Sequence, residues 1–383
     1  MSSLGELVAE RSVLVCCGSG GVGKTTVAAS IALRAASEGR RTCVVTIDPA
    51  KRLADALGLA SLTNTPSLVG GDWSGELWAM MLDTKATFDE LIVRYSGSPS
   101  RAEAILANRI YRDLSTALSG TQEYMASEKL YQLHADERFD LVVVDTPPTR
   151  NALDFIEAPR RLVRFLDNRV FRMVMAPTKA YLRVASVATR SVLRTMSKVV
   201  GSEVVDDVVD FFGVFEGMED GFRSRAAGVT GLLCSPETAF ALVASPRSDA
   251  VSEALYLADQ LDKQRIPVAQ VVVNRMHPRF DEPPARPGTP SGPSRPSEPS
   301  LPTGQSGQSR QSRPTGPSEL LAVLEANLAE LRALAESEEA SVAALAARLP
   351  RSPLVRVPVL AGDVHSLSGL AEVADLLFGG DGR

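Results

Sequence analysis

Gly18–Thr26, with the sequence GSGGVGKTT, is the most informative stretch of this chain. It fits the pattern G-x-x-x-x-G-K-[ST], in which glycines let backbone N–H groups converge on phosphate oxygens. The apolar run Val13–Cys17 precedes it and predicts a buried strand, and Thr25–Glu38 follows it and predicts a helix that ends at Gly39. A strand, a glycine loop and a helix start in this order predict a phosphate-binding loop.

Each residue type in the loop has a chemical reason. The helix start directs its positive end at the phosphates, and Lys24 is expected to reach the β- and γ-phosphates of a nucleotide. The hydroxyl of Thr25 is placed to bind Mg²⁺. The predicted nucleotide-binding residues of the loop are Gly20, Gly21, Val22, Gly23, Lys24, Thr25 and Thr26.

Composition narrows the class of protein. The 383 residues, 44% of them hydrophobic, are enough for one large α/β domain, which we take to span residues 1–383. A net charge of −5 gives no reason to expect nucleic acid as a partner. The chain shows no signal peptide and no apolar run near 18 residues, so we expect a cytoplasmic protein, with peripheral membrane association as an alternative.

The four cysteines, Cys16, Cys17, Cys43 and Cys234, show no metal-binding spacing. Three of them fall in expected strands. Buried reduced thiols are the prediction that follows.

Apolar strand candidates alternate with helical stretches along the chain, which predicts a doubly wound, mostly parallel sheet of the P-loop NTPase type. The expected strands are Val13–Cys17, Thr42–Ile47, Leu77–Leu82, Leu141–Val144, Ala239–Ala244, Val268–Val273 and Val355–Val357. In such a sheet the ligand lies at the carboxyl ends of the strands.

Two segments, residues 84–136 and 158–225, interrupt the sheet and predict an inserted helical subdomain. Residues 160–198 carry ten Lys or Arg and one acid, and residues 203–220 carry seven acids and no base. Residues 281–318, with ten prolines and a single Leu, predict a disordered Pro/Ser/Gly-rich loop. The leucines that follow it, from Leu320 to Leu334, have a helical period.

Two carboxylates follow expected strands. The apolar run Leu141–Val144 ends in Asp145, a pattern typical of a residue that holds Mg²⁺ directly or through water. Asp48 follows the strand Thr42–Ile47, where a carboxylate beside a γ-phosphate can accept a proton or orient water.

These segments together resemble the ArsA-type ATPase family, which includes arsenite-pump ATPases and the targeting ATPase of tail-anchored membrane proteins. The loop GGVGKTT resembles that family's deviant Walker A loop, Asp48–Lys51 its D-P-A-H switch and Asp145–Asn151 its D-T-A-P-T-G-H switch. The resemblance implies an ATPase that uses ATP and Mg²⁺, with Asp48 and Lys24 as catalytic residues. It also places Asn274 and Pro358 beside the adenine ring, because strand-end segments with these residues match the family's base-binding loops.

The chain departs from the family at Ser19, where a second lysine usually reaches the nucleotide across a dimer interface. Three explanations stay open: a mixed dimer with a lysine-bearing homologue, which we favour; a homodimer in which Lys51, Arg52 or Arg150 substitutes; and a non-catalytic, nucleotide-gated binding subunit. A ParA/MinD-like positioning ATPase is a further alternative. A hydrophobic client or a membrane surface is an expected partner of the basic helical segment.

Overall fold

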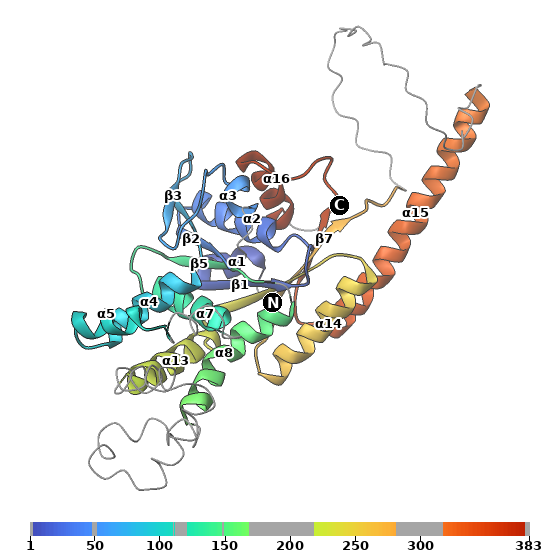
Figure 1. The fold of residues 1–383 in the computed structure, drawn as a ribbon. Coiled ribbons are helices and arrows are strands. Elements are labelled where there is room, and N and C mark those ends of the chain that lie inside the picture. The colour runs from blue at the N-terminus through green and yellow to red at the C-terminus, as the bar shows by residue number, and fades with distance from the viewer. Residues whose placement is uncertain are drawn as a thin grey trace, which may run out of the picture.

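The computed structural model describes residues 3–47, 52–109, 111, 121–147, 149–167, 218–280 and 317–379 (Figure 1). Within them an eight-stranded sheet has the order β3-β4-β2-β5-β1-β6-β7-β8. Neighbouring strands pair in parallel, except that β3 and β4 pair antiparallel. The strands are β1 Val13–Gly18, β2 Arg41–Thr46, β3 Ser67–Val69, β4 Glu76–Met81, β5 Leu141–Asp145, β6 Thr238–Ala244, β7 Val268–Met276 and β8 Leu354–Pro358. The predicted fold class is confirmed.

The central strands are buried on both faces, which explains why their sequences are apolar without alternation. In β1, Val13, Val15 and Cys17 belong to one buried cluster, while Leu14 and Cys16 belong to the other. The first cluster is covered by α7, α8, α13, α14 and α15, and the second by α1, α2, α3 and α16. Figure 1 shows these two helical layers on opposite sides of the sheet.

Before, between and after the strands, the described residues also form helices. They are α1 Leu4–Glu10, α2 Lys24–Ser37, α3 Arg52–Ala56, α4 Thr84–Tyr95, α5 Pro99–Ala107, α7 Thr121–His134, α8 Thr149–Asp167, α13 Glu219–Leu233, α14 Ser248–Lys263, α15 Pro317–Arg348 and α16 Leu367–Phe378. Helix α15 extends away from the sheet in Figure 1. Towards its N-terminal end the helix exposes several apolar side chains, namely Leu320, Leu321, Val323, Leu324, Leu331 and Leu334.

A third buried cluster lies among α4, α5, α7, α8 and α13 and includes Leu91, Ile105 and Phe222. These helices overlap the two segments expected to form a helical subdomain, whose boundaries stay a prediction, and α13 runs past the expected end at residue 225. Helix α8 begins at Thr149, earlier than the expected start at residue 158. Residues 168–217 and 281–316 lie outside the described residues, and with them most of the basic segment and of the expected disordered loop.

An ion pair joins two helices of this region. Nε of Arg225 on α13 donates to Oε1 and Oε2 of Glu128 on α7, at 2.8 Å and 2.9 Å, and the Glu128 side chain is fully buried. The Arg225 guanidinium also lies 4.2 Å from the centroid of the Tyr131 ring. The pKa of Glu128 is raised, because the effect of burial outweighs the opposing effect of the neighbouring Arg225. A buried carboxylate needs such a partner, and the pair links α13 to α7.

The cysteines give a prediction about reactivity. Cys16, Cys17 and Cys43 are buried, whereas Cys234 is exposed. Burial raises the pKa of Cys16 and Cys43, and raises that of Cys17 to about 12. Since the thiolate is the reactive form, a disulfide reagent at pH 8 is expected to modify one thiol in the native chain and four in denaturant. The Cys234→Ser variant is the control and should lose the fast reaction; two fast thiols in the native chain would contradict the prediction.

Candidate active site

The phosphate loop joins β1 to α2 and turns with glycines in the left-handed region. Gly21 has φ +76° and Gly23 has φ +91°, conformations that residues with a Cβ rarely adopt. At Gly23 a Cβ would also lie 2.2 Å from Nδ2 of Asn274. Glycine is therefore required there both by the turn and by a neighbouring side chain.

Lys24 is the first residue of α2, and its side chain bends back over the loop. It is only 8% exposed, and its Nζ donates to the carbonyl oxygen of Ser19 at 2.8 Å. The residue that caps α2 is Gly23, which has no side chain to occupy the first N–H groups of the helix. An ammonium group and the positive end of a helix thus lie at the same loop, an arrangement suited to phosphate.

Asp145 ends β5 directly beside the start of α2. One of its carboxylate oxygens, Oδ2, accepts from the hydroxyl of Thr25 at 2.7 Å and from that of Thr46 at 2.9 Å. Asp145 is 1% exposed. Carboxylate and hydroxyl oxygens are the donors that Mg²⁺ prefers, so the residues present fit this ion. The structure thus brings together Thr25 and Asp145, the two metal-binding residues predicted from the sequence.

Thr46 was not predicted as a site residue. It ends β2, and the parallel pairing of β2 with β5 places it opposite Asp145. The sequence shows only a threonine near the end of an apolar run, and its contact depends on the register between two strands. That register was the missing signal.

The predicted base-binding residues lie on neighbouring strands. Asn274 pairs with Val357, and Pro358 comes next on β8, opposite Met276. Asn274 is 9% exposed; its Nδ2 donates to the carbonyl oxygen of Val22 at 2.9 Å, and its Oδ1 accepts from the backbone N–H of Arg275 at 3.0 Å. The structure brings Asn274 and Pro358 to one strand-end region next to the loop, and their contact with adenine stays a prediction.

Asp48 and Lys51 lie outside the described residues. Arg52 is the first residue of α3, just after that gap. The catalytic role of Asp48 therefore stays a prediction.

The sequence comparison decides the family. Residues 11–285 match the family model described as anion-transporting ATPase, which is well over half of the chain. The chain belongs to the anion-transporting ATPase family. This match confirms the family predicted from the motifs and, at the level of class, the predicted P-loop ATPase.

Individual relatives are of moderate similarity to this chain. An ATPase ASNA1 homolog of Cryptosporidium parvum is 28% identical over 267 residues, which cover 70% of this chain and 65% of that protein. ATPase GET3B of Arabidopsis thaliana is 26% identical over 298 residues, covering 73% of this chain and 68% of that protein. The chain thus spans about two thirds of these relatives, and the activity, substrates and partners of the whole protein are proposals.

Ser19 takes the place of the lysine expected from the family pattern and is buried, with 4% of its surface exposed. Its carbonyl group accepts from Lys24, and its hydroxyl has no hydrogen-bond partner among the described residues. A serine side chain is uncharged, and this one is short and buried, so it cannot replace a lysine that contacts a second nucleotide.

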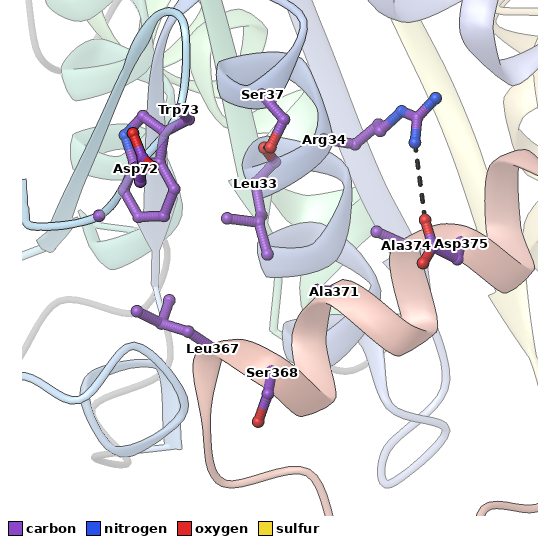
Figure 2. Close-up of a pocket in the computed structure, with 11 residues that line it drawn as sticks. Leu33, Arg34, Ser37, Asp72, Trp73, Leu367, Ser368, Ala371, Ala374 and Asp375 are labelled. Atoms are coloured by element: carbon purple, nitrogen blue, oxygen red, sulfur yellow. Dashed lines mark hydrogen bonds and ion pairs between the residues drawn. The ribbon is translucent and has the colours of Figure 1, made fainter.

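A pocket of about 390 Å³ lies at the other end of α2, between that helix, the segment before β4 and α16. Figure 2 shows Arg34 on α2 facing Asp375 on α16, with 3.6 Å between Nη1 and Oδ1, and Trp73 on the opposite side. Ten residues of helix, about 15 Å, separate Lys24 from Arg34. This pocket is therefore distinct from the candidate active site.

The described helices were also compared with the length and apolar character of a membrane-spanning helix. Among the described residues, no helix combines the length and the apolar character that crossing a membrane requires.

Proposed function

We propose that this chain hydrolyses ATP to ADP and phosphate at the loop between β1 and α2, with Mg²⁺. The observation that supports it is the convergence of Lys24, Thr25 and Asp145 at one edge of the sheet, with Thr25 and Asp145 in direct contact at 2.7 Å. A cation, a helix start and a pair of hard oxygen ligands are the groups that bind a nucleoside triphosphate and its Mg²⁺.

In the proposed reaction each side chain has one task. Lys24 leaves the Ser19 carbonyl and donates to the β- and γ-phosphate oxygens, where it stabilises negative charge. Asp48 orients a water molecule and accepts its proton as the water oxygen bonds to the γ-phosphorus. The bond from that phosphorus to the β–γ bridging oxygen then breaks, and ADP leaves.

Thr25 and Asp145 would hold Mg²⁺, with Thr46 fixing the carboxylate by its second hydrogen bond. Mg²⁺ supplies neutralisation of the phosphate charge when it is bound. Asn274 and Pro358 are proposed to border the adenine ring.

The assembly we propose is a mixed dimer with a homologue that keeps the lysine which Ser19 replaces. The partner's lysine would serve the ATP bound here, and a cation supplied in trans contributes about 10³–10⁵ in rate in comparable enzymes. Hydrolysis would then drive a conformational change that serves a hydrophobic client or a membrane-associated targeting or transport step. The client would meet the expected subdomain of residues 84–136 and 158–225, where Phe165 is 56% exposed at the end of α8.

The test is ATP turnover by the chain alone and mixed with a homologue from the same organism. We expect slow turnover alone and a large gain in the mixture. The Ser19→Lys variant is expected to raise turnover without the partner. Full activity of the isolated chain that Ser19→Lys leaves unchanged would exclude the mixed dimer. ATP binding without turnover in either preparation would favour the binding subunit instead, and Asp48→Asn separates the two because only a hydrolase loses rate while keeping ATP affinity.

A further inference from the structure

The end of β7 holds two consecutive carbonyl groups of the phosphate loop. Asn274 Nδ2 donates to the carbonyl oxygen of Val22 at 2.9 Å, and Arg275 Nη1 donates to that of Gly21 at 3.2 Å. We propose that Asn274 and Arg275 form a clamp that sets the loop in its phosphate-binding conformation. They are thus positioning residues for the nucleotide, an inference that rests on the proposed function.

The clamp acts through the geometry of the peptide unit. The described backbone contains no cis peptide bonds, and in a trans peptide the C=O and the following N–H point in opposite directions. Holding the carbonyls of Gly21 and Val22 toward β7 therefore turns the N–H groups of Val22 and Gly23 to the opposite side. Two neighbouring amides with one fixed direction form the concave donor set that binds phosphate oxygens.

Gly23 makes the clamp sterically feasible. The Asn274 amide reaches the loop through the space that a side chain at this position would fill, since a Cβ would lie 2.2 Å from Nδ2. The same residue caps the N-terminus of α2, so the amide that contacts Val22 lies next to the start of the helix. The contact is buried, which shields its hydrogen bond from water.

Arg275 has an unusual backbone for a strand. Its φ is +64°, and the pairing of β7 with β8 shifts register between Asn274 and Met276. Strand bulges of this kind redirect a side chain, and here the redirected side chain is the one that meets Gly21. The strand leaves its regular ladder at the residue that contacts the loop.

A second arginine shows what an ordinary left-handed residue looks like in this chain. Arg265 has φ +60°, but it lies just after the last turn of α14, and its N–H donates to the carbonyl of Asp262 at 2.9 Å. Helices commonly end with one left-handed residue, so helix termination accounts for Arg265. No helix ends at Arg275, and its conformation is accounted for by the contact with the loop.

The clamp and the base-reading role of Asn274 make different predictions. A base-reading residue discriminates between ATP and GTP and has no effect on a ligand without a base. A clamp affects ATP, GTP and inorganic tripolyphosphate by the same factor, because all three place phosphates in the loop. Tripolyphosphate affinity is therefore the measurement that separates the two.

The experiment measures the Kd of Mg-ATP, Mg-GTP and Mg-tripolyphosphate by calorimetry for the full chain and for Asn274→Ala, Arg275→Gly and Arg265→Gly. Loss of one orienting hydrogen bond is expected to weaken all three ligands by about tenfold in Asn274→Ala and by about fivefold in Arg275→Gly. Arg265→Gly is the matched control and should leave every Kd unchanged. Both glycine variants adopt a positive φ freely, so neither should lower Tm.

The outcomes separate cleanly. A variant at Asn274 that loses only the discrimination between ATP and GTP, with tripolyphosphate affinity intact, overturns the clamp. So does an Arg275→Gly chain that behaves like Arg265→Gly. If Asn274→Ala does not fold, Arg275→Gly carries the test alone. A wild-type chain that binds these ligands but hydrolyses no ATP, alone or mixed with the homologue, refutes the proposed reaction and leaves the clamp standing, whereas a wild-type chain that binds none of them refutes both.

Discussion

Replacing Lys24 by alanine is expected to slow ATP hydrolysis by about 10³. The ammonium group is buried beside the loop and held at 2.8 Å from the Ser19 carbonyl, so the folded chain keeps a cation where the phosphates are expected. A buried donor directed at developing charge stabilises the transition state far more than an exposed one. Steady-state release of phosphate at saturating Mg-ATP measures the effect.

The matched control is Lys85→Ala. Lys85 lies on α4, is half exposed and pairs with Asp89 at 2.6 Å, a surface contact that has no part in the site. Its loss should leave turnover unchanged. A Lys24→Ala chain with more than a tenth of wild-type turnover would show that the reaction does not depend on this lysine, and the proposed site would be wrong.

Replacing Asp145 by asparagine is expected to remove the dependence of turnover on Mg²⁺ and to lower the rate by about 10² or more. Asparagine keeps the size of the side chain, and its oxygen can still accept from Thr25 and Thr46, whose hydroxyls lie 2.7 Å and 2.9 Å from the carboxylate. The change therefore removes the negative charge with little effect on packing. Turnover measured across a Mg²⁺ titration shows whether the metal response is lost.

Asp140→Asn is the control for charge on the same stretch of chain. Asp140 directly precedes β5 at the end remote from the loop and pairs with Arg41 at 2.6 Å on the surface. The control should titrate with Mg²⁺ like the wild type. If Asp145→Asn shows an unchanged Mg²⁺ midpoint and rate, the metal is held by other residues.

The sheet could be predicted because burial on both faces leaves a mark in the sequence. All seven predicted strands are present, and none of their ends differs from the prediction by more than three residues. Strand β3, Ser67–Val69, was missed. It is three residues long, pairs on one edge only and exposes 55% of Leu68, so no apolar run announces it.

Periodicity predicts a helix but not which surface covers it. The leucines from Leu320 to Leu334 indicated helix, and α15 does run from Pro317 to Arg348. Its second half buries Val342 and Leu345 against the sheet, while Leu321 and Leu324 in the first half are more than half exposed. The same spacing of apolar residues serves both halves, so the sequence alone could not distinguish them.

Some residues of the candidate site could be predicted from the sequence, and others could not. Lys24, Thr25 and Asp145 could be placed together because a glycine loop and a strand-end carboxylate meet at one edge of a parallel sheet. Thr46 and Arg275 could not, because the first depends on strand register and the second on a bulge that forms only when β7 and β8 pair. A motif records which groups the chemistry needs, whereas tertiary pairing decides which neighbours hold them.

The strand order also sets a sequence of events for the growing chain. Strands β1 to β5 form a continuous block, β3-β4-β2-β5-β1, and β6, β7 and β8 then add to its free edge in the order in which they are synthesised. Because domains begin to fold as they leave the ribosome, Lys24 and Asp145 are expected to meet well before Asn274 and Arg275 exist to restrain the loop. Nascent chains that end before β7 should therefore be compact but unable to retain nucleotide, which makes ligand capture a late step of biogenesis.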